Sequence, residues 1–120
     1  MPLAGLILFA PGRLAQASPP TFVQLTNTLG PVQFFPPAIS DGGTRVAFLS
    51  RANIAGLNPG ADLALYAIDP TAAVPPVRIA ATYTFTADTE FRPSLSGDGL
   101  KIAFSGFEPG VARRGVFVAN

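Results

Sequence analysis

The side chains of this chain that could take part in catalysis are mainly carboxylates. They are Asp41, Asp62, Asp69, Asp88, Glu90, Asp98 and Glu108. Two carboxylates that flank a glycosidic bond can hydrolyse it, one as the acid and the other as base or nucleophile. However, Asp41 and Asp98 stand beside glycines in turn-like sequences, where Asp is favoured because its side chain bonds to the nearby backbone. Asp69 stands at the end of a strand-like run. We therefore assign no catalytic residue.

Several other catalytic groups are missing from the sequence. The chain has no His and no Cys, which excludes Ser-His-Asp and Cys-His catalysis, imidazole metal sites and disulfide bonds. It also lacks the G-x-S-x-G turn of hydrolases and a Gly-rich phosphate-binding loop. We predict that the chain is not an enzyme and binds no cofactor.

Residues 51–62 form the longest loop between two strand-like runs, and they contain side chains that suit Ca²⁺. These side chains belong to Asn53, Asn58 and Asp62. One carboxylate is few for an ion that takes roughly six to eight oxygen ligands, and the D-x-D-x-D-G spacing is absent. We therefore predict a surface loop closed by Asn and Gly residues, with no metal bound.

The charge of the chain is low and scattered. The net charge is +1, and only 12% of the residues are charged. Arg113-Arg114 is the only adjacent basic pair. Proteins that bind nucleic acids usually carry a clustered basic surface that neutralises phosphates. We predict no nucleic-acid partner.

The first 17 residues have most features of an export signal. Leu3 to Ala10 form a continuous apolar run, and Ala15-Gln16-Ala17 is a small-x-small cleavage pattern. Eight apolar residues are too few to cross a hydrocarbon core of about 30 Å, so we predict no membrane span. No basic residue precedes the run, and the alternative is an apolar strand or tail. We predict a signal peptide over 1–17 and a periplasmic or secreted protein.

The chain resembles itself when it is shifted by 56 residues. Pro37 falls on Pro93, and Gly43 falls on Gly99. Further along, Phe48 falls on Phe104, with conservative replacements between these matches. Repeats of this length are typical of solenoids, propellers and arrays, whose units stack because none can bury its apolar faces alone.

Each repeat unit reads as a series of short strands. The first hairpin of each unit turns at Asp41-Gly42-Gly43 or Gly97-Asp98-Gly99, and a three-residue loop with Gly third predicts positive φ at that Gly. Later strands are expected over 44–50, 63–68 and 77–81, and over 100–105 and 115–119 in the next unit. Their apolar runs do not alternate, which is typical of strands covered on both faces.

These strands predict an all-β fold. Four antiparallel strands per repeat, buried on both faces, are typical of β-propeller blades. We expect a lone strand over 21–26, a blade over 35–81 and a partial blade over 91–120, within one segment that spans 18–120. Asp88 and Glu90 would then approach the innermost strand of the second blade, where the channel of a propeller opens.

The repeated motif resembles a known family. Residues 37–48 and 93–104 are similar to the P-x-[IL]-S-x-D-G-x-[KR]-[IV]-A-F core of TolB-type, WD-like propeller repeats. Residues 22–27 resemble the x-x-Q-L-T-N segment that often precedes this core. Gly42 departs from the pattern because the family has Asp there, so we expect a looser turn in the first unit. The resemblance implies a periplasmic protein that binds other proteins.

Two functions remain open on the sequence. The first is an exported propeller segment that acts as a protein-binding scaffold. The alternative is the N-terminal propeller of an exported prolyl oligopeptidase-like hydrolase whose catalytic domain lies elsewhere. About two blades form an incomplete propeller, since closure takes four to eight. We expect either a fragment with further blades, or self-association through open blade edges, with residues 22–26 completing the last blade of a neighbour.

Overall fold

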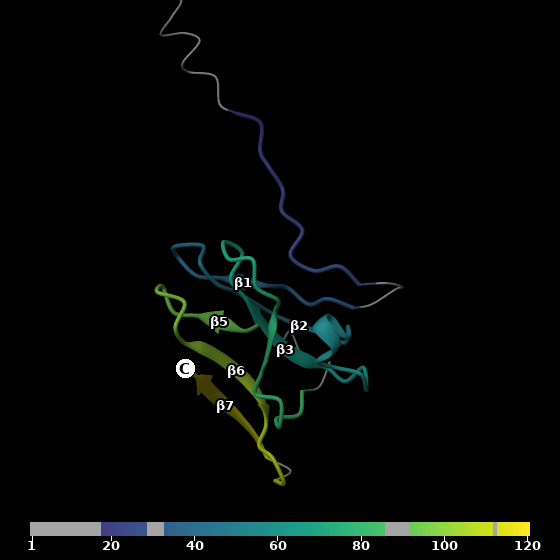
Figure 1. Ribbon diagram of the computed structural model, residues 1–120. Coiled ribbons are helices and arrows are strands. Elements are labelled where there is room, and N and C mark those ends of the chain that lie inside the picture. Colours follow the sequence, from purple (N-terminus) through teal and green to yellow (C-terminus); the bar gives the residue numbers. More distant parts are fainter. Residues whose placement is uncertain (1–17, 29–32, 86–91, 112) are drawn as a thin grey trace, which may run out of the picture.

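The protein contains two antiparallel β-sheets and almost no helix, as shown by a computed structural model that describes residues 18–28, 33–85, 92–111 and 113–120 (Figure 1). The strands of the first sheet, in spatial order, are β1 (Ala38–Ile39), β2 (Val46–Ser50), β3 (Ala64–Ile68) and β4 (Val77–Ile79). Those of the second are β5 (Ser94–Leu95), β6 (Ile102–Phe107) and β7 (Arg114–Ala119). A short 3-10 turn, η1 (Ile54–Gly56), is the one helical element of the described residues. The all-β prediction is therefore confirmed.

Glycine closes the first hairpin turn of each sheet. Gly43 has φ 69° and Gly99 has φ 74°, so the predicted positive angles are confirmed. Their amides donate to the carbonyl oxygens of Ser40 and Ser96, both at 2.9 Å. The first turn thus keeps this bond although Gly42 replaces the expected Asp. The left-handed conformation suits Gly because it has no Cβ to collide with the backbone.

Residues related by the sequence repeat occupy equivalent positions in the strand pairing of the two sheets. Ala47 of β2 lies opposite Ala67 of β3, and Ala103 of β6 lies opposite Val118 of β7. Ala47 and Ala103 are 56 residues apart in the sequence, whereas Ala67 and Val118 are 51 apart. The loop from β6 to β7 is therefore shorter than the loop from β2 to β3. The same side chains therefore share a face in both sheets.

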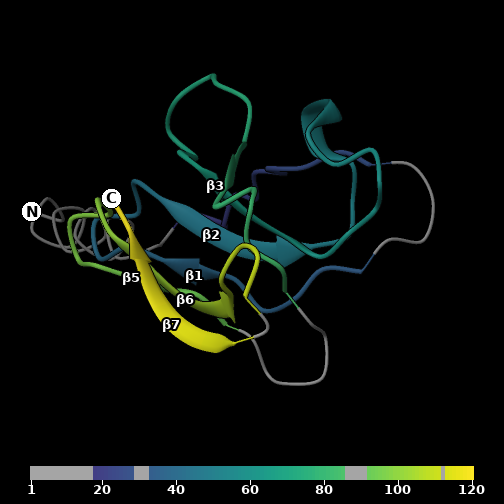
Figure 2. The same ribbon diagram turned by 90° about the horizontal axis from the view of Figure 1, so that it is seen from below.

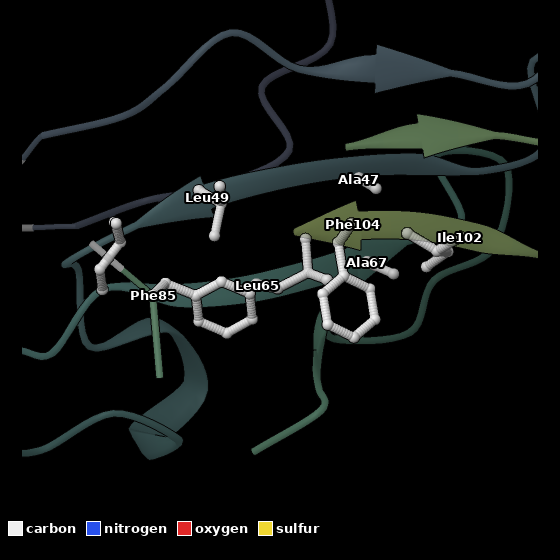
Figure 3. Packing of buried hydrophobic residues seen from close by; sticks show 8 residues of the cluster. Ala47, Leu49, Leu65, Ala67, Phe85, Ile102 and Phe104 are labelled. Carbon is white, nitrogen blue, oxygen red and sulfur yellow. The ribbon is translucent and has the colours of Figure 1, made fainter. Parts of the chain in front are cut away.

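The two sheets lie against each other (Figure 2), and the main hydrophobic core lies between them (Figure 3). We call it the inner cluster, and it consists of Ala47, Leu49, Leu63, Leu65, Ala67, Phe85, Ile102 and Phe104. Ile102 and Phe104 of β6 point toward the small side chains of β2 and β3 in the close view (Figure 3). Burial of these apolar groups holds the sheets together.

A second cluster covers the opposite face of the first sheet. We call it the outer cluster, and it consists of Val46, Phe48, Ala52, Ile54, Ala64, Tyr66 and Ile68. Leu25 packs against it, and η1 contributes Ile54. All five residues of β2 and all five of β3 are buried, because the first sheet is covered on both faces. This explains the uninterrupted apolar runs of β2 and β3. In β6 and β7 burial alternates along the strand, so the prediction of strands covered on both faces is wrong for the second sheet, which packs only through its inner face.

Two strand predictions differ from the structure. Residues 21–26 form no strand, and Phe22 and Val23 are 92% and 73% exposed. The apolar sequence favours a strand, but a strand needs a partner for its backbone groups, and no neighbouring strand pairs with this segment among the described residues. The strand predicted over 77–81 ends at Ile79, because Ala80 takes φ 51° and begins a turn closed by the Tyr83 amide at 2.9 Å.

Some predictions fall on residues that the structure does not describe. The signal peptide over 1–17 lies outside the described ranges, as do Asp88 and Glu90. Within the described ranges, no helix has the length and apolar character needed to cross a membrane.

Candidate protein-contact groove

Two acidic side chains, Asp98 and Asp69, bond to residues of their own turns. The Asp98 carboxylate accepts hydrogen bonds from Ser96 Oγ at 2.6 Å and from the Leu100 amide at 3.0 Å. Asp69 accepts in the same way from the hydroxyl and amide of Thr71, at 2.6 and 2.8 Å. These donors favour the charged form, and in each case the hydroxyl contributes most to a pKa below the ordinary value of Asp. Asp98 thus forms the local hydrogen bonds expected of an Asp in a turn, and Asp69 forms similar bonds after the end of β3.

The side chains of Asn53 and Asn58 hold the loop over 51–62 together, and Asp62 takes part through its backbone carbonyl. Asn53 Oδ1 accepts a hydrogen bond from the backbone N–H of Asn58 at 2.8 Å. Asn58 is only 1% exposed, and its Nδ2 donates to the Asp62 carbonyl at 2.7 Å, with longer bonds of 3.4 Å to the carbonyls of Arg51 and Ala52. These amide groups therefore hold the backbone of the loop.

Tyr66 fixes this loop to the first sheet. Its hydroxyl donates to the Ala52 carbonyl at 2.8 Å, and its ring stacks on Phe48 with 5.7 Å between centroids. Burial is the main cause that raises the pKa of the Tyr66 hydroxyl above its ordinary value of 10.0. The loop is consequently tied to the outer cluster by this hydrogen bond.

At the opposite end of the sheets, three connections surround a groove. They are the hairpin turns before β2 and β6 and the longer connection between β3 and β4. The groove has a volume of about 330 Å³. It is lined by Thr44, Arg45, Ala67, Ile68, Asp69, Val74, Pro75, Val77, Asp98, Gly99 and Leu100. We call it the turn-end groove.

The two hairpin turns that flank the groove contact each other closely. Arg45 Nη1 donates to the Gly99 carbonyl at 3.3 Å. A Cβ on Gly99 would lie 3.1 Å from the Arg45 Cβ and 3.3 Å from Ser40 Oγ. A Cβ on Gly97 would lie 2.7 Å from Asp41 Oδ2. Glycine at both positions therefore allows the turns of the two sheets to pack side by side.

Apolar side chains are exposed around the turn-end groove. Val74, Val77 and Leu100 are 54%, 49% and 64% exposed. Charged side chains of both signs share the lining, Arg45 on one hairpin and Asp69 at the end of β3 among them. Exposed apolar residues that gather within a polar rim are typical of surfaces that bind other proteins.

The amino-acid sequence alone does not indicate this groove. Its residues lie far apart in the chain and meet only because the two sheets stack. One local signal was available, since the segment Ala72-Ala73-Val74-Pro75-Pro76 is a connection without any charged residue. A loop of that composition exposes apolar groups unless a neighbour covers it.

Comparison with protein-family models, with curated proteins and with solved structures finds no match to this chain.

Proposed function

We propose that this chain is a segment of an exported, TolB-like β-propeller and that it acts as a protein-binding scaffold. The repeated P-x-[IL]-S-x-x-G core supports the family, and the Ala-x-Ala pattern at residues 15–17 supports export. The turn-end groove supports the binding role. Its three exposed apolar side chains within a charged rim are the observation that carries the proposal.

The way the sheets stack supports the propeller architecture. Phe48 of the first sheet belongs to the outer cluster, whereas its counterpart Phe104 in the second sheet belongs to the inner cluster and faces the first sheet. Val46 and Ile102 are related in the same way. The equivalent face of each sheet therefore contacts the part of the chain that comes before it in the sequence, which is the first sheet for β6 and residues around Leu25 for β2. Blades in a propeller are related in this way. A face-to-face sandwich of two hairpin sheets would not require this relation.

Protein contacts of propellers concentrate in the connections at the ends of the strands, because the sheets themselves are buried between neighbours. The turn-end groove lies at such an end. A partner that inserts one or two apolar side chains between Val74 and Leu100 would bury their exposed area, and Arg45 and Asp69 would fix its polar groups.

The experiment is site-specific photo-cross-linking in intact cells that express the full chain. A benzophenone amino acid replaces Val74 or Leu100 in the groove. The control replaces Leu57, which is 39% exposed and lies in the loop at the other end of the sheets. We expect a discrete cross-linked protein from positions 74 and 100 and none from 57. Absence of any discrete product from the groove, or equal products from all three positions, would contradict the proposal.

A further inference from the structure

A second cavity lies at the end of the first sheet opposite the turn-end groove. In this antiparallel sheet the end of β2, the start of β3 and the end of β4 fall on one edge. The loop over 51–62 and the segment over 81–85 leave from this edge, and both line the cavity together with Arg78 of β4. We call it the loop-end cavity. Its volume is about 280 Å³, just below the roughly 300 to 1,000 Å³ of cavities that hold drug-sized ligands, so it suits a smaller molecule.

Charged side chains of both signs line the loop-end cavity without pairing with each other. Arg51 directly follows β2, Asp62 lies two residues before β3, and Arg78 belongs to β4. Within the described ranges, no ion pair joins Asp62 to either arginine. The Arg51 guanidinium and the Asp62 carboxylate also form no hydrogen bond there. A cavity that keeps opposite charges apart is complementary to a ligand that places its own opposite charges between them.

Hydrogen bonds of the loop hold these charged residues in place. The buried Asn58 side chain donates to the Asp62 carbonyl at 2.7 Å and to the Arg51 carbonyl at 3.4 Å, so one amide fixes the backbone of both. Arg78 Nη1 donates to the Leu57 carbonyl at 3.0 Å. A guanidinium has several further N–H donors, which leaves Arg78 able to bind a ligand as well. The site is therefore preorganised by the fold of the loop.

The cavity also has an apolar part. Leu63 and Phe85 line it and are only 3% and 6% exposed. Phe85 packs on Phe104 of β6 with 5.8 Å between ring centroids, so this wall belongs to the inner cluster. Thr82 and Thr84 line the cavity as well, and both are exposed. A ligand with charged groups at one end and a small apolar group at the other would match both parts.

We propose that the loop-end cavity binds a small apolar α-amino acid. The carboxylate of the amino acid contacts the guanidinium groups of Arg51 and Arg78, and its ammonium group donates to the Asp62 carboxylate. Arginine suits the first role because its fork of N–H donors matches both oxygens of a carboxylate. The apolar side chain of the amino acid contacts Leu63 and Phe85. None of these residues lines the turn-end groove, so the inference does not depend on the proposed protein-binding role.

Isothermal titration calorimetry of the full chain tests the ligand class with three compounds of similar shape. L-Valine carries both charges, 3-methylbutanoate lacks the ammonium group, and L-valinamide lacks the carboxylate. We expect saturable binding of L-valine and at least about tenfold weaker binding of the other two, because each loses a charge-assisted hydrogen bond. No saturable binding of L-valine, or equal binding of the three compounds, would overturn the proposal.

Substitution of Arg51 tests the contact with the carboxylate. Arg51→Gln should weaken L-valine binding about tenfold or more, since Gln cannot offer the charged fork of donors. The matched control is Arg113→Gln, which removes the same charge from an exposed residue outside the cavity and should leave the affinity unchanged. An affinity that is unchanged in Arg51→Gln, or equally reduced in the control, would reduce the site to general electrostatic attraction and contradict the proposal.

Asp62→Asn gives a readout that a purely structural role of Asp62 would not change. The Asp62 backbone carbonyl still accepts its hydrogen bond from Asn58 in this variant, so the loop should keep its conformation. L-Valine should bind about tenfold more weakly, because its ammonium group loses a charged partner. The affinity for 3-methylbutanoate should stay equal or rise, because a like charge has been removed. A parallel loss of both ligands, or no loss of L-valine, would contradict the assigned role.

Thermal unfolding provides a second measurement, because a ligand that binds only the folded state raises the midpoint. L-Valine should raise the midpoint of the parent and of Arg113→Gln, but not that of Arg51→Gln. Without ligand, Arg51→Gln should unfold as the parent does, since Arg51 is exposed. An equal rise in Arg51→Gln would overturn the site. Failure of this proposal leaves the protein-binding role untouched, since cross-linking from positions 74 and 100 probes the other end of the sheets.

Discussion

Single residues at the contact between the two hairpin turns have distinct steric demands. Gly43 and Gly99 both have positive φ, but only Gly99 lies against the neighbouring turn. Gly43 has no atom within 4 Å of an added Cβ. Substitution of Gly43 therefore measures the cost of the left-handed backbone alone, whereas substitution of Gly99 adds the cost of a packing collision.

We expect Gly43→Ala to lower the free energy of unfolding by about 1 kcal/mol, the usual cost of a left-handed Ala. Gly99→Ala should cost about 2 to 3 kcal/mol, because its Cβ also meets Arg45 and Ser40. Urea denaturation of both variants measures the difference. Equal losses would show that the two turns do not pack as closely as the contact distances indicate.

Tyr66 makes stability depend on alkaline pH. Because burial raises its pKa, the folded protein holds the phenol proton more tightly than the unfolded chain does. This contribution is complete below the ordinary pKa of 10.0 and is lost as pH rises through the folded value. Tyr66→Phe removes the 2.8 Å hydrogen bond to the Ala52 carbonyl, which keeps only the 3.4 Å bond from Asn58 Nδ2, and should cost about 1 to 2 kcal/mol near neutral pH.

Denaturation of the parent and Tyr66→Phe at neutral and at strongly alkaline pH measures this effect. The gap between the two proteins should narrow as pH rises. Tyr83→Phe is the control, since Tyr83 packs against the inner cluster on the other face of the first sheet, and the alkaline loss of stability should persist in this variant. A gap that stays constant with pH would contradict the role given to the Tyr66 proton.

At the scale of elements, the hairpins follow from their turn residues. Glycine in the third loop position predicted both turns and their φ angles, because few other residues adopt that conformation. Strand positions within each sheet followed from the apolar runs between these turns. The segment over 21–26 could not be predicted in this way, because its local sequence favours a strand while its partner strand is missing from its own surroundings.

The first sheet should become more stable when its hairpin turn receives the Asp found in the turn of the second sheet. Asp98 accepts two hydrogen bonds within its turn, and Gly42 occupies the equivalent position. An added Cβ there meets only Thr44 Cγ2, at 3.8 Å, so the side chain fits. Gly42→Asp should raise the midpoint of thermal unfolding, with about 0.5 to 1 kcal/mol from the stiffer unfolded chain alone. The reciprocal change, Asp98→Gly, should lower the midpoint, and an unchanged midpoint in both would contradict this account.

At the scale of the whole molecule, the sequence indicated the stacking of sheets but not the groove that stacking produces. The 56-residue offset places matching side chains on matching faces, so the layered arrangement follows from Phe48 and Phe104. The turn-end groove depends on how three connections meet across two layers. That meeting is decided by contacts such as the one between Arg45 and Gly99, for which the sequence holds no local signal.

The connection between β3 and β4 has one more consequence. Its bend is closed by Asp69 and Thr71 within the connection, whereas the sheets are joined by the hairpin turns and the inner cluster. Residues 72–74 are exposed and can therefore change without loosening the sheets. If the groove binds a protein as proposed, natural variation or library selection at these three positions would redirect its specificity while the framework stays the same, so recognition and folding would evolve separately at this end of the molecule.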